Sequence, residues 1–291
     1  MKAIRTLSVS DFRCRHLPVI AFALAAPVAA SGESLQGECG TADDVSRTHV
    51  TDVYPSGSQL PANLLRFYVY FSKPMNREQV ISAVTLRDSD DLPVDGAFLP
   101  TRFALWSDDS RRLTLILDPG RVKTGLRAHD ELGRALVAGD TYTLRIGDAA
   151  EDASGCIVGA AFDKPFKVVA PLVRQPSLAA WQLDVPTAGT REPLVVTLDG
   201  PYDHLSLAYR LRVRASDDTT VPGRIELADN ERVWQFTPRN TWRERSYTLA
   251  VERELEDLAG NRLGALFDQP LADRGPEPTN ADLRRHFNPM R

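Results

Sequence analysis

Two segments of the chain carry identical residues at matched positions, and every matched pair lies 105 residues apart, as 257 − 152 shows. A gap-free match at so many positions is not expected by chance and indicates an internal repeat. We therefore predict two copies of one module. The matched residues are Tyr142, Thr143, Leu144, Glu151, Asp152, Gly155, Gly159, Ala160, Phe162, Asp163 and Pro165 in the first copy and Tyr247, Thr248, Leu249, Glu256, Asp257, Gly260, Gly264, Ala265, Phe267, Asp268 and Pro270 in the second.

The stretch before the repeats has the three parts of a secretory signal peptide. A basic start is followed by an apolar run over residues 17–26 and by the small residues Val28, Ala29 and Ala30. We expect cleavage after Ala30. The apolar run is about half the length that a membrane-spanning helix needs. The sequence thus predicts an exported protein, periplasmic or extracellular, that does not span the membrane.

Composition bounds the remaining possibilities. The chain has 291 residues, of which 43% are hydrophobic and 25% charged, so it is long and apolar enough for about two folded domains. Its formal net charge of −4 provides no overall attraction to nucleic acid, and we predict no nucleic-acid partner. Cys14 leaves with the signal peptide. Cys39 and Cys156 then share an oxidising compartment, where a disulfide is expected and two free thiols are the alternative.

Short apolar or alternating runs separated by Gly, Pro and Asp turns recur along the chain. They have the length and composition of β-strands, whereas helical periodicity is confined to the region near residues 126–137. Many short strands without alternating helices favour an antiparallel β-sandwich. The expected strands cover residues 64–71, 80–86, 112–117, 141–146 and 164–169 in the first copy and 194–198, 207–213, 233–236 and 247–251 in the second.

The repeated block has the features of the last hairpin of such a sandwich. The carboxylates of Asp152 and Asp257 can accept hydrogen bonds from the backbone amides that follow them. Gly155 and Gly260 can adopt the positive φ that the chain reversal needs. We therefore assign these four residues to a structural turn. Tyr142, like its counterpart in the second copy, stands where a sandwich often uses a tyrosine hydroxyl to fix a corner.

The motifs resemble bacterial immunoglobulin-like (Ig-like) domains of the surface-layer (SbsA) type. The first copy carries Phe-Ser-Lys-Pro-Met at 71–75, Gly-Asp-Thr-Tyr at 139–142 and Asp-Ala-Ser-Gly at 152–155, although Cys156 replaces the usual asparagine. The second copy keeps Asp-Leu-Ala-Gly-Asn at 257–261 but has Leu-Asp-Gly-Pro-Tyr at 198–202 in place of the first motif. The resemblance implies an all-β protein of two tandem Ig-like antiparallel β-sandwich domains.

The resemblance also implies domain boundaries and a disulfide. We expect a signal peptide at 1–30, an N-terminal segment at 31–47, a first domain at 48–170, a second at 171–272 that includes the linker, and a mobile tail at 273–291 with one helical turn over 283–287. In this topology the first strand starts at the end of the sandwich that holds the last turn. Cys39 and Cys156 would then meet and tie the N-terminal segment to the first domain.

The first copy has an inserted loop, because its segment from Pro119 to Tyr142 is more than twice as long as the matching segment from Pro238 to Tyr247. The inserted loop, near residues 120–138, carries Arg121, Lys123 and Arg127. Cationic side chains on a loop of a rigid sandwich can donate hydrogen bonds to an anionic partner, and we take these three as a candidate partner-binding loop. The alternative is a solvated loop in which Leu126, Leu132 and Leu136 pack on the sheet.

Candidate chemistry is sparse. The sequence lacks the nucleophile, zinc-protease and phosphate-loop motifs, and its histidines are scattered, so we predict no enzyme and no cofactor. Asp88, Asp90 and Asp91 could offer oxygens to Ca²⁺, but a turn explains them equally and their spacing lacks a full ligand loop, so we assign no metal site. Among the tryptophans, Trp106 and Trp242 are the better candidates for stacking on sugar rings.

These observations predict an exported, non-catalytic structural or binding module of the bacterial envelope, with an envelope protein or a polysaccharide as partner. The alternative is a carbohydrate-active or other hydrolytic protein. It would require paired carboxylates at the domain interface, about 5 to 10 Å apart. The sequence does not identify the ligand.

Overall fold

The fold is described from a computed structural model. The structure describes residue 39 and residues 47–100, 105–123, 126–268 and 283–291. The predicted signal peptide and most of the N-terminal segment lie outside the described residues, as does the first part of the predicted tail. No helix of the described residues is both long and apolar enough to cross a membrane.

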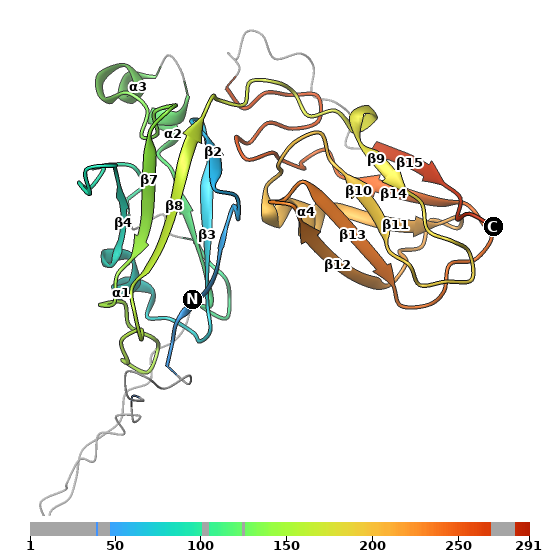
Figure 1. Cartoon of the computed structure of the whole chain (residues 1–291), viewed down its shortest axis with the longest axis horizontal. Coiled ribbons are helices and arrows are strands. Elements are labelled where there is room, and N and C mark those ends of the chain that lie inside the picture. Colours follow the sequence, from blue (N-terminus) through green and yellow to red (C-terminus); the bar gives the residue numbers. More distant parts are fainter. Residues whose placement is uncertain (1–38, 40–46, 101–104, 124–125, 269–282) are drawn as a thin grey trace, which may run out of the picture. The chain divides into compact units, whose positions relative to one another are not determined.

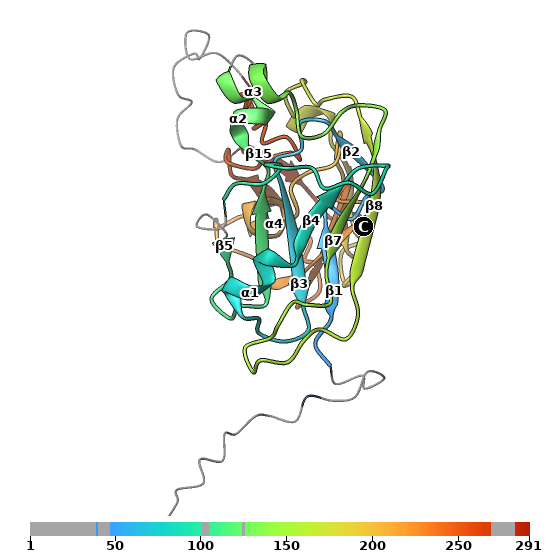
Figure 2. The same ribbon diagram turned by 90° about the vertical axis from the view of Figure 1, so that its left-hand side faces the viewer.

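Residues 50–169 form a β-sandwich that we call the N-terminal lobe. One sheet has the order β1 (Val50–Tyr54), β3 (Arg66–Phe71), β6 (Arg112–Ile116) and β5 (Leu105–Trp106), with every neighbouring pair antiparallel. The other has the order β2 (Gln59–Pro61), β8 (Phe162–Val169), β7 (Thr141–Ile146) and β4 (Val84–Arg87), in which only β2 and β8 run parallel. The two sheets form two layers (Figures 1 and 2).

Alternation of apolar and polar residues explains the N-terminal core. Phe67 and Val69 of β3 point inward, as do Leu144 and Ile146 of β7 and Phe166 of β8, and all are buried. The intervening residues point outward. Three short helices cross the ends of the sheets: α1 (Arg77–Ser82), α2 (Pro119–Val122) and α3 (Arg127–Leu132).

A second sandwich, which we call the C-terminal lobe, begins after the short 3-10 helix η2 (Leu178–Ala180). Its first sheet has the order β12 (Gly223–Ala228), β13 (Val233–Pro238), β10 (Leu194–Thr197) and β9 (Gln182–Asp184). The second has the order β11 (Leu211–Ala215), β14 (Tyr247–Val251) and β15 (Leu283–Phe287). Helix α4 (His204–Arg210) leads into β11. A separate core of buried residues, including Trp234, Trp242 and Leu249, fills this lobe.

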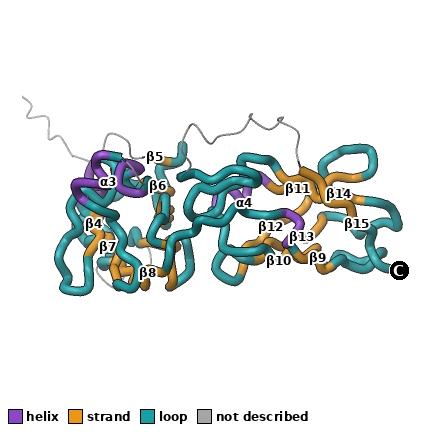
Figure 3. Tube along the Cα trace, turned by 90° about the horizontal axis from the view of Figure 1, so that it is seen from above, coloured by secondary structure: helices purple, strands orange, loops and turns teal. Residues whose placement is uncertain are grey.

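The all-β prediction is confirmed, because strands in two layered sandwiches make up most of the regular structure and the helices are short (Figure 3). Two predicted strands are partly wrong. Residues 80–86 contain the end of α1 before β4 begins, and residues 207–213 contain the end of α4 before β11 begins. In both places a strand begins within two residues of the end of a helix, so that one apolar run belongs to two elements.

The predicted mobile tail needs a correction. Residues 283–287 are the strand β15 and not a helical turn, and they pair with the whole of β14. Tyr247 lies opposite Phe287, just as Tyr142 lies opposite Phe166. The separation of Phe287 from Phe166 is therefore larger than the separation that relates the other matched pairs. The last strand of the second copy is displaced along the chain, and the C-terminal lobe extends beyond the predicted boundary at 272.

The corner tyrosines occupy the same place in both lobes. The hydroxyl of Tyr142 accepts a hydrogen bond from the backbone amide of Val137 at 3.2 Å, and that of Tyr247 accepts one from Arg243 at 3.0 Å. Each hydrogen bond holds the segment that precedes the strand against the tyrosine, whose ring is buried in the core. The repeated tyrosines thus have a structural role of the kind the sequence predicts.

Candidate functional site between the lobes

The two repeated turns are built in the same way. Asp152 Oδ1 accepts hydrogen bonds from the amides of Ser154 and Cys156, and Gly155 has a φ of +80°. In the second copy Asp257 Oδ1 accepts from Ala259 and Asn261, and Gly260 has a φ of +78°. Both glycines have the positive φ that residues with a Cβ adopt at a cost, which explains the repeated glycine.

The second carboxylate oxygen of each turn has a different partner in each copy. In the C-terminal lobe the side chain of Asn261 donates to Asp257 Oδ2 at 2.9 Å. The first copy has Cys156 at the matching position, and there the hydroxyl of Thr48 donates to Asp152 Oδ2 at 2.7 Å. Thr48 lies just ahead of β1. In the first copy, Thr48 therefore donates the hydrogen bond that the asparagine side chain donates in the second copy.

The disulfide between Cys39 and Cys156 is present, which confirms the predicted pair. Its position beside the Asp152 turn means that this turn holds the N-terminal segment twice, once through the disulfide and once through Thr48. A bridge across 117 residues removes much conformational freedom from the unfolded chain.

The second turn contacts the N-terminal lobe. We call residues 256–267 the interface turn. Within the compact unit Gln36–Arg291, its Leu258 is buried in the core cluster of the N-terminal lobe, and the Leu258 carbonyl accepts a hydrogen bond from the amide of Leu65 at 2.9 Å. Phe267 packs against the same cluster, with the ammonium of Lys123 4.1 Å from its ring centre. One repeated motif therefore serves as an internal turn and as a contact between lobes.

Asparagine side chains fasten the linker to both lobes. The carbonyl of Leu172 accepts hydrogen bonds from Asn63 at 2.8 Å and from Asn261 at 3.1 Å, and the amide of Leu172 donates to Asn63 at 2.8 Å. Each turn thus holds the chain that enters its own lobe: Thr48 for the first copy and Leu172 for the second.

A partly buried ionic cluster continues the interface. The Arg66 guanidinium of β3 forms an ion pair with Glu256 and lies 3.7 Å from Asp203 Oδ2. The hydroxyl of Tyr68 donates to the same Asp203 oxygen at 2.8 Å. Burial, reinforced by the negative charge of Asp203, raises the pKa of Tyr68, so the phenol stays protonated and able to donate.

The remaining oxygens of the two carboxylates are also occupied. Asp203 Oδ1 accepts the backbone amide of Ser206 and so caps α4. Glu256 Oε1 accepts from the guanidinium of Arg262 at 2.7 Å. The side chains of Asp203 and Glu256 are only 5% and 12% exposed, so both carboxylates have little contact with water and are paired within the protein.

An aromatic and acidic contact completes the interface at β1. The rings of Tyr54 and His204 stack with centres 3.5 Å apart. The buried carboxylate of Glu231 accepts the amide of Ser56 at 2.9 Å and lies 3.8 Å from His204 Nδ1. Glu231 ends a run of three left-handed residues that starts at Asp229, a conformation that L-residues adopt at a cost.

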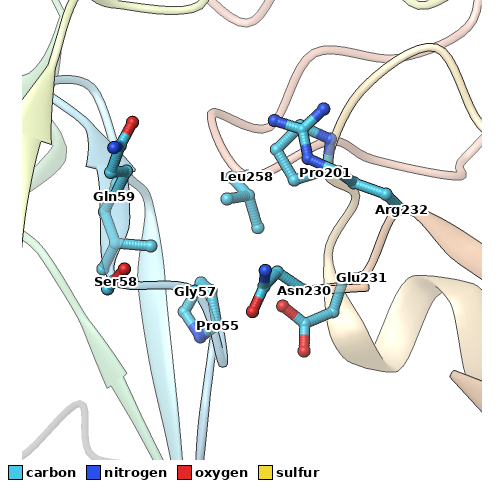
Figure 4. A pocket seen from close by; sticks show the side chains of 10 residues that line it. Pro55, Gly57, Ser58, Gln59, Pro201, Asn230, Glu231, Arg232 and Leu258 are labelled. Atoms are coloured by element: carbon cyan, nitrogen blue, oxygen red, sulfur yellow. The ribbon is translucent and has the colours of Figure 1, made fainter. Parts of the chain in front are cut away.

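A small polar cavity of about 220 Å³ opens beside this contact. Figure 4 shows Gln59 on one wall and Arg232 across from it, with Asn230 and Glu231 between them. Drug-sized ligands occupy pockets of roughly 300 to 1,000 Å³, so this cavity suits one small polar group. It is the candidate ligand site of the interface.

The three candidate partner-binding residues have different surroundings in the structure. Arg121 is only 7% exposed and donates to the carbonyls of Asp95 and Gly133, so the prediction that it faces a partner is wrong. The alternative, a solvated loop with packed leucines, holds only in part, since Leu136 is buried but Leu126 is 42% exposed. Lys123 contacts the interface turn. Arg127 is exposed and pairs with Glu131.

The other candidate positions have structural surroundings. The Asp88 carboxylate accepts the amides of Asp90 and Leu92, which is a turn. Trp242 is buried and donates to the Glu192 carbonyl at 2.8 Å, so it is not a platform for sugars. Trp106 stacks on Phe71.

Sequence analysis missed Arg66, Tyr68, Asp203 and Glu256, the residues of the ionic cluster. One signal was present. Residues 66–71 read Arg-Phe-Tyr-Val-Tyr-Phe, so the outward face of this strand carries two tyrosines. Aromatic residues on an outward face indicate that something covers it. What covers it depends on residues far away in the sequence, which no local pattern reveals.

No protein-family model matches the chain, and no curated protein matches it. Solved structures with a similar chain path include domains 1–6 of the surface-layer protein SbsC, with 14% identity over 71% of this chain and 23% of that chain and a TM-score of 0.31. They also include α2-macroglobulin from Escherichia coli spanning domains MG0-NIE-MG1, with 15% identity over 84% and 72% of the two chains and a TM-score of 0.28. The Ig1-2 module of the Drosophila receptor tyrosine phosphatase DLAR has 13% identity over 72% and 93% and a TM-score of 0.25.

The chain spans less than a quarter of the surface-layer structure that it matches. All three TM-scores are below 0.5, so the fold described above rests on the strands, sheets and cores of this chain.

Proposed function

We propose that the protein is an exported, non-catalytic structural or binding module of the bacterial envelope, in which two Ig-like sandwiches are fixed to each other. The observation that carries this proposal is the interface, where a turn of one lobe enters the core of the other and a partly buried ionic cluster lies beside it. Such an interface favours a stiff unit over two domains that move independently on a linker. Stiffness suits a spacer or a binding platform.

Export is supported by two features. The disulfide is of a kind that persists in the periplasm or outside the cell and is rare in the cytosol. Residues 1–30 have the composition of a signal peptide. We propose the periplasm or the cell surface as location, two SbsA-type copies as the domain plan, and an envelope protein or polysaccharide as the partner.

The hydrolytic alternative finds two close carboxylates at the interface, since Asp203 and Glu256 contact the same guanidinium. Glycoside hydrolysis needs one of them as a proton donor and the other open to water or substrate. Here one carboxylate caps a helix and accepts a tyrosine hydroxyl, and the other is held by two arginines. These contacts serve the interface, which favours the non-catalytic role.

Cell fractionation tests the proposal directly. A bacterium producing the full chain should yield it in the periplasm or the medium, with Cys39 and Cys156 oxidised, and a variant lacking residues 1–30 should stay in the cytoplasm. Retention of the full chain in the cytoplasm with both thiols reduced would contradict export.

Activity assays separate the two functions. The wild type should release no sugars from a panel of envelope polysaccharides. Hydrolysis that disappears in Glu256→Gln, while Glu244→Gln remains active as a control on an exposed carboxylate, would instead establish the hydrolytic alternative.

A further inference from the structure

Strand β12 is an unprotected edge of the C-terminal lobe. It stands at the end of its sheet, where β13 is its only neighbour among the described strands (Figure 1). All six of its residues pair with β13 in one unbroken register. The strand contains no proline, lysine or bulge, which are the features that usually keep an edge strand from pairing with another chain. Its free edge is therefore able to accept a further strand.

Other edge strands of the described sheets are short, irregular or covered. β5 and β9 have two and three residues, and the register of β1 is interrupted. The segments that follow β4 and β11 cover part of those two edges. Val94 donates its backbone amide to the carbonyl of Leu86 in β4 at 2.9 Å. Val221 donates to the carbonyl of Val213 in β11 at 2.8 Å. With six residues, β12 is the longest edge strand.

The backbone groups of alternate residues in β12 point away from β13. The amide of Arg239 donates to the carbonyl of Pro222 at 2.8 Å, so the carbonyl of Pro222 faces the strand β13. In an antiparallel pair the N–H and C=O of one residue point to the same side, and this side alternates along the strand. The N–H and C=O groups of Gly223, Ile225 and Leu227 therefore point to the free edge.

This edge is accessible. Helix α4 lies near β12, yet Gly223 and Ala228, at the two ends of the strand, are both exposed. Because glycine has no side chain, the exposure of Gly223 is exposure of its backbone. Ile225 and Leu227 are only partly buried against the core of the lobe. A strand added at this edge would cover both side chains.

We propose that two copies of the chain associate through β12, with the two strands antiparallel and Ile225 facing itself across a two-fold axis. Gly223 of each copy then lies opposite Leu227 of the other. In this register the outward-pointing N–H and C=O groups of all three residues face their counterparts, so the ladder continues from one copy into the next. The contact uses the same surface of both copies, as a two-fold dimer requires.

The charged side chains of β12 select this register. Arg224 lies opposite Glu226 of the second copy, and Glu226 lies opposite Arg224, with Cβ atoms about 4.5 to 5.5 Å apart. Moving one strand by two residues would place Arg224 opposite Arg224 or Glu226 opposite Glu226, and facing like charges destabilise a sheet. Moving it by one residue would bring opposite faces of the two strands together. The strand is thus complementary to itself in one antiparallel register.

The existing contact between these two side chains does not oppose the exchange. Within one chain Arg224 pairs with Glu226 at 2.9 Å, and the two side chains are 72% and 46% exposed. An exposed ion pair contributes little to stability, so either group can take a partner on the second copy.

Sedimentation velocity of the oxidised mature protein between about 1 µM and 1 mM tests the dimer. A contact along one strand is small, so the wild type should form a weak dimer whose share rises with concentration. Ile225→Pro removes an N–H that points to the free edge and leaves the ladder with β13 intact. This variant should stay monomeric over the same range. The dimer does not depend on export or on the envelope role.

Charge exchange tests the register. Arg224→Glu and Glu226→Arg each place like charges opposite each other, and each should weaken the dimer by about tenfold or more. An equimolar mixture of the two restores opposite charges at both pairs and should form a mixed dimer. Arg127→Glu and Glu131→Arg make the same charge changes at an ion pair of the N-terminal lobe that is 87% and 58% exposed, and both should associate as the wild type does.

Four outcomes would overturn the proposal: a monomer over the whole concentration range, a dimer that Ile225→Pro leaves intact, an equal loss in the Arg127 and Glu131 controls, or no mixed dimer from the two charge variants of β12. If Ile225→Pro does not fold, the charge variants, which change only exposed side chains, decide the question.

Discussion

The repeated glycines provide a matched test of the interface. Gly155 and Gly260 occupy equivalent turns and have nearly the same φ, +80° and +78°. A Cβ built on Gly155 meets nothing within 4 Å, whereas one on Gly260 stands 2.8 Å from Leu65 Cδ2 and 3.3 Å from the ring of Phe267. Leu65 belongs to the N-terminal lobe and is buried. Alanine at 260 must therefore move the two lobes or the side chains between them.

The magnitudes follow from these contacts. Alanine in the left-handed region costs about 1 to 2 kcal/mol, partly offset by the lower entropy of the unfolded chain, and this term is common to both variants. Overpacking a buried contact costs a further 1 to 3 kcal/mol, roughly, and applies to Gly260→Ala alone. We expect Gly260→Ala to be less stable than Gly155→Ala by about 1 to 3 kcal/mol.

Urea unfolding of the oxidised proteins, followed by tryptophan fluorescence, measures this difference. The free energy of unfolding of each variant is compared with that of the wild type in the same buffer. Equal losses in the two variants would show that the interface turn does not pack on Leu65, and the stiff two-lobe unit would have to be abandoned.

Three further predictions concern single groups. Tyr68→Phe should lower the free energy of unfolding by about 1.5 to 3 kcal/mol, because it removes a buried hydrogen bond to a carboxylate. The control Tyr209→Phe, at an exposed ring, should change the free energy of unfolding by less than about 0.5 kcal/mol. Equal effects of the two variants would count against the ionic cluster. Cys39→Ser with Cys156→Ser should cost about 5 kcal/mol in the chain-entropy model; a thermal midpoint unchanged by reductant would contradict this. Burial raises the pKa of Asp257 from 3.8 to about 6, so the folded state binds more protons than the unfolded state between these pH values. The stabilisation from this proton is complete below about pH 4 and is lost as the pH rises through 6, and the pKa difference of 6 − 3.8 = 2.2 makes it about 3 kcal/mol of unfolding free energy. A urea midpoint that stays constant between pH 4 and 7 would refute this prediction.

Much of the fold could be predicted because the signals are local. Alternation in β3, β7 and β8 indicates strands, and the Asp-x-x-Gly turns identify the hairpin that follows. The disulfide could be predicted from the count of cysteines together with the expected topology. The helix-to-strand junctions at Ser82 and Arg210 were misassigned, because one apolar run spans both elements in each case.

Strand β15 was missed for a physical reason. Leu283 and Phe287 are its core residues, and a spacing of four fits a helical turn as well as a strand. The repeat also led to a domain boundary at 272, before this strand begins. Only pairing with β14, a strand whose residues are all buried, distinguishes these interpretations.

The interface could not be predicted, because its partners are distant in sequence. Arg66 and Glu256 are 190 residues apart, and Tyr68 and Asp203 are 135 apart. The turns at Asp152 and Asp257 have the same Asp-x-x-Gly motif, so nothing in the motif indicates that only the turn at Asp257 packs against the other lobe.

The late position of β15 affects the order in which the two lobes can fold during synthesis. All the strands of the N-terminal lobe precede residue 170, so that sandwich can close while later residues are still being made. The C-terminal lobe must wait for β15, since Phe287 packs on the rings of Trp242 and Tyr247. A truncated protein that stops at residue 272, where the repeat suggests a boundary, would leave one edge of β14 unpaired and ready to join another chain.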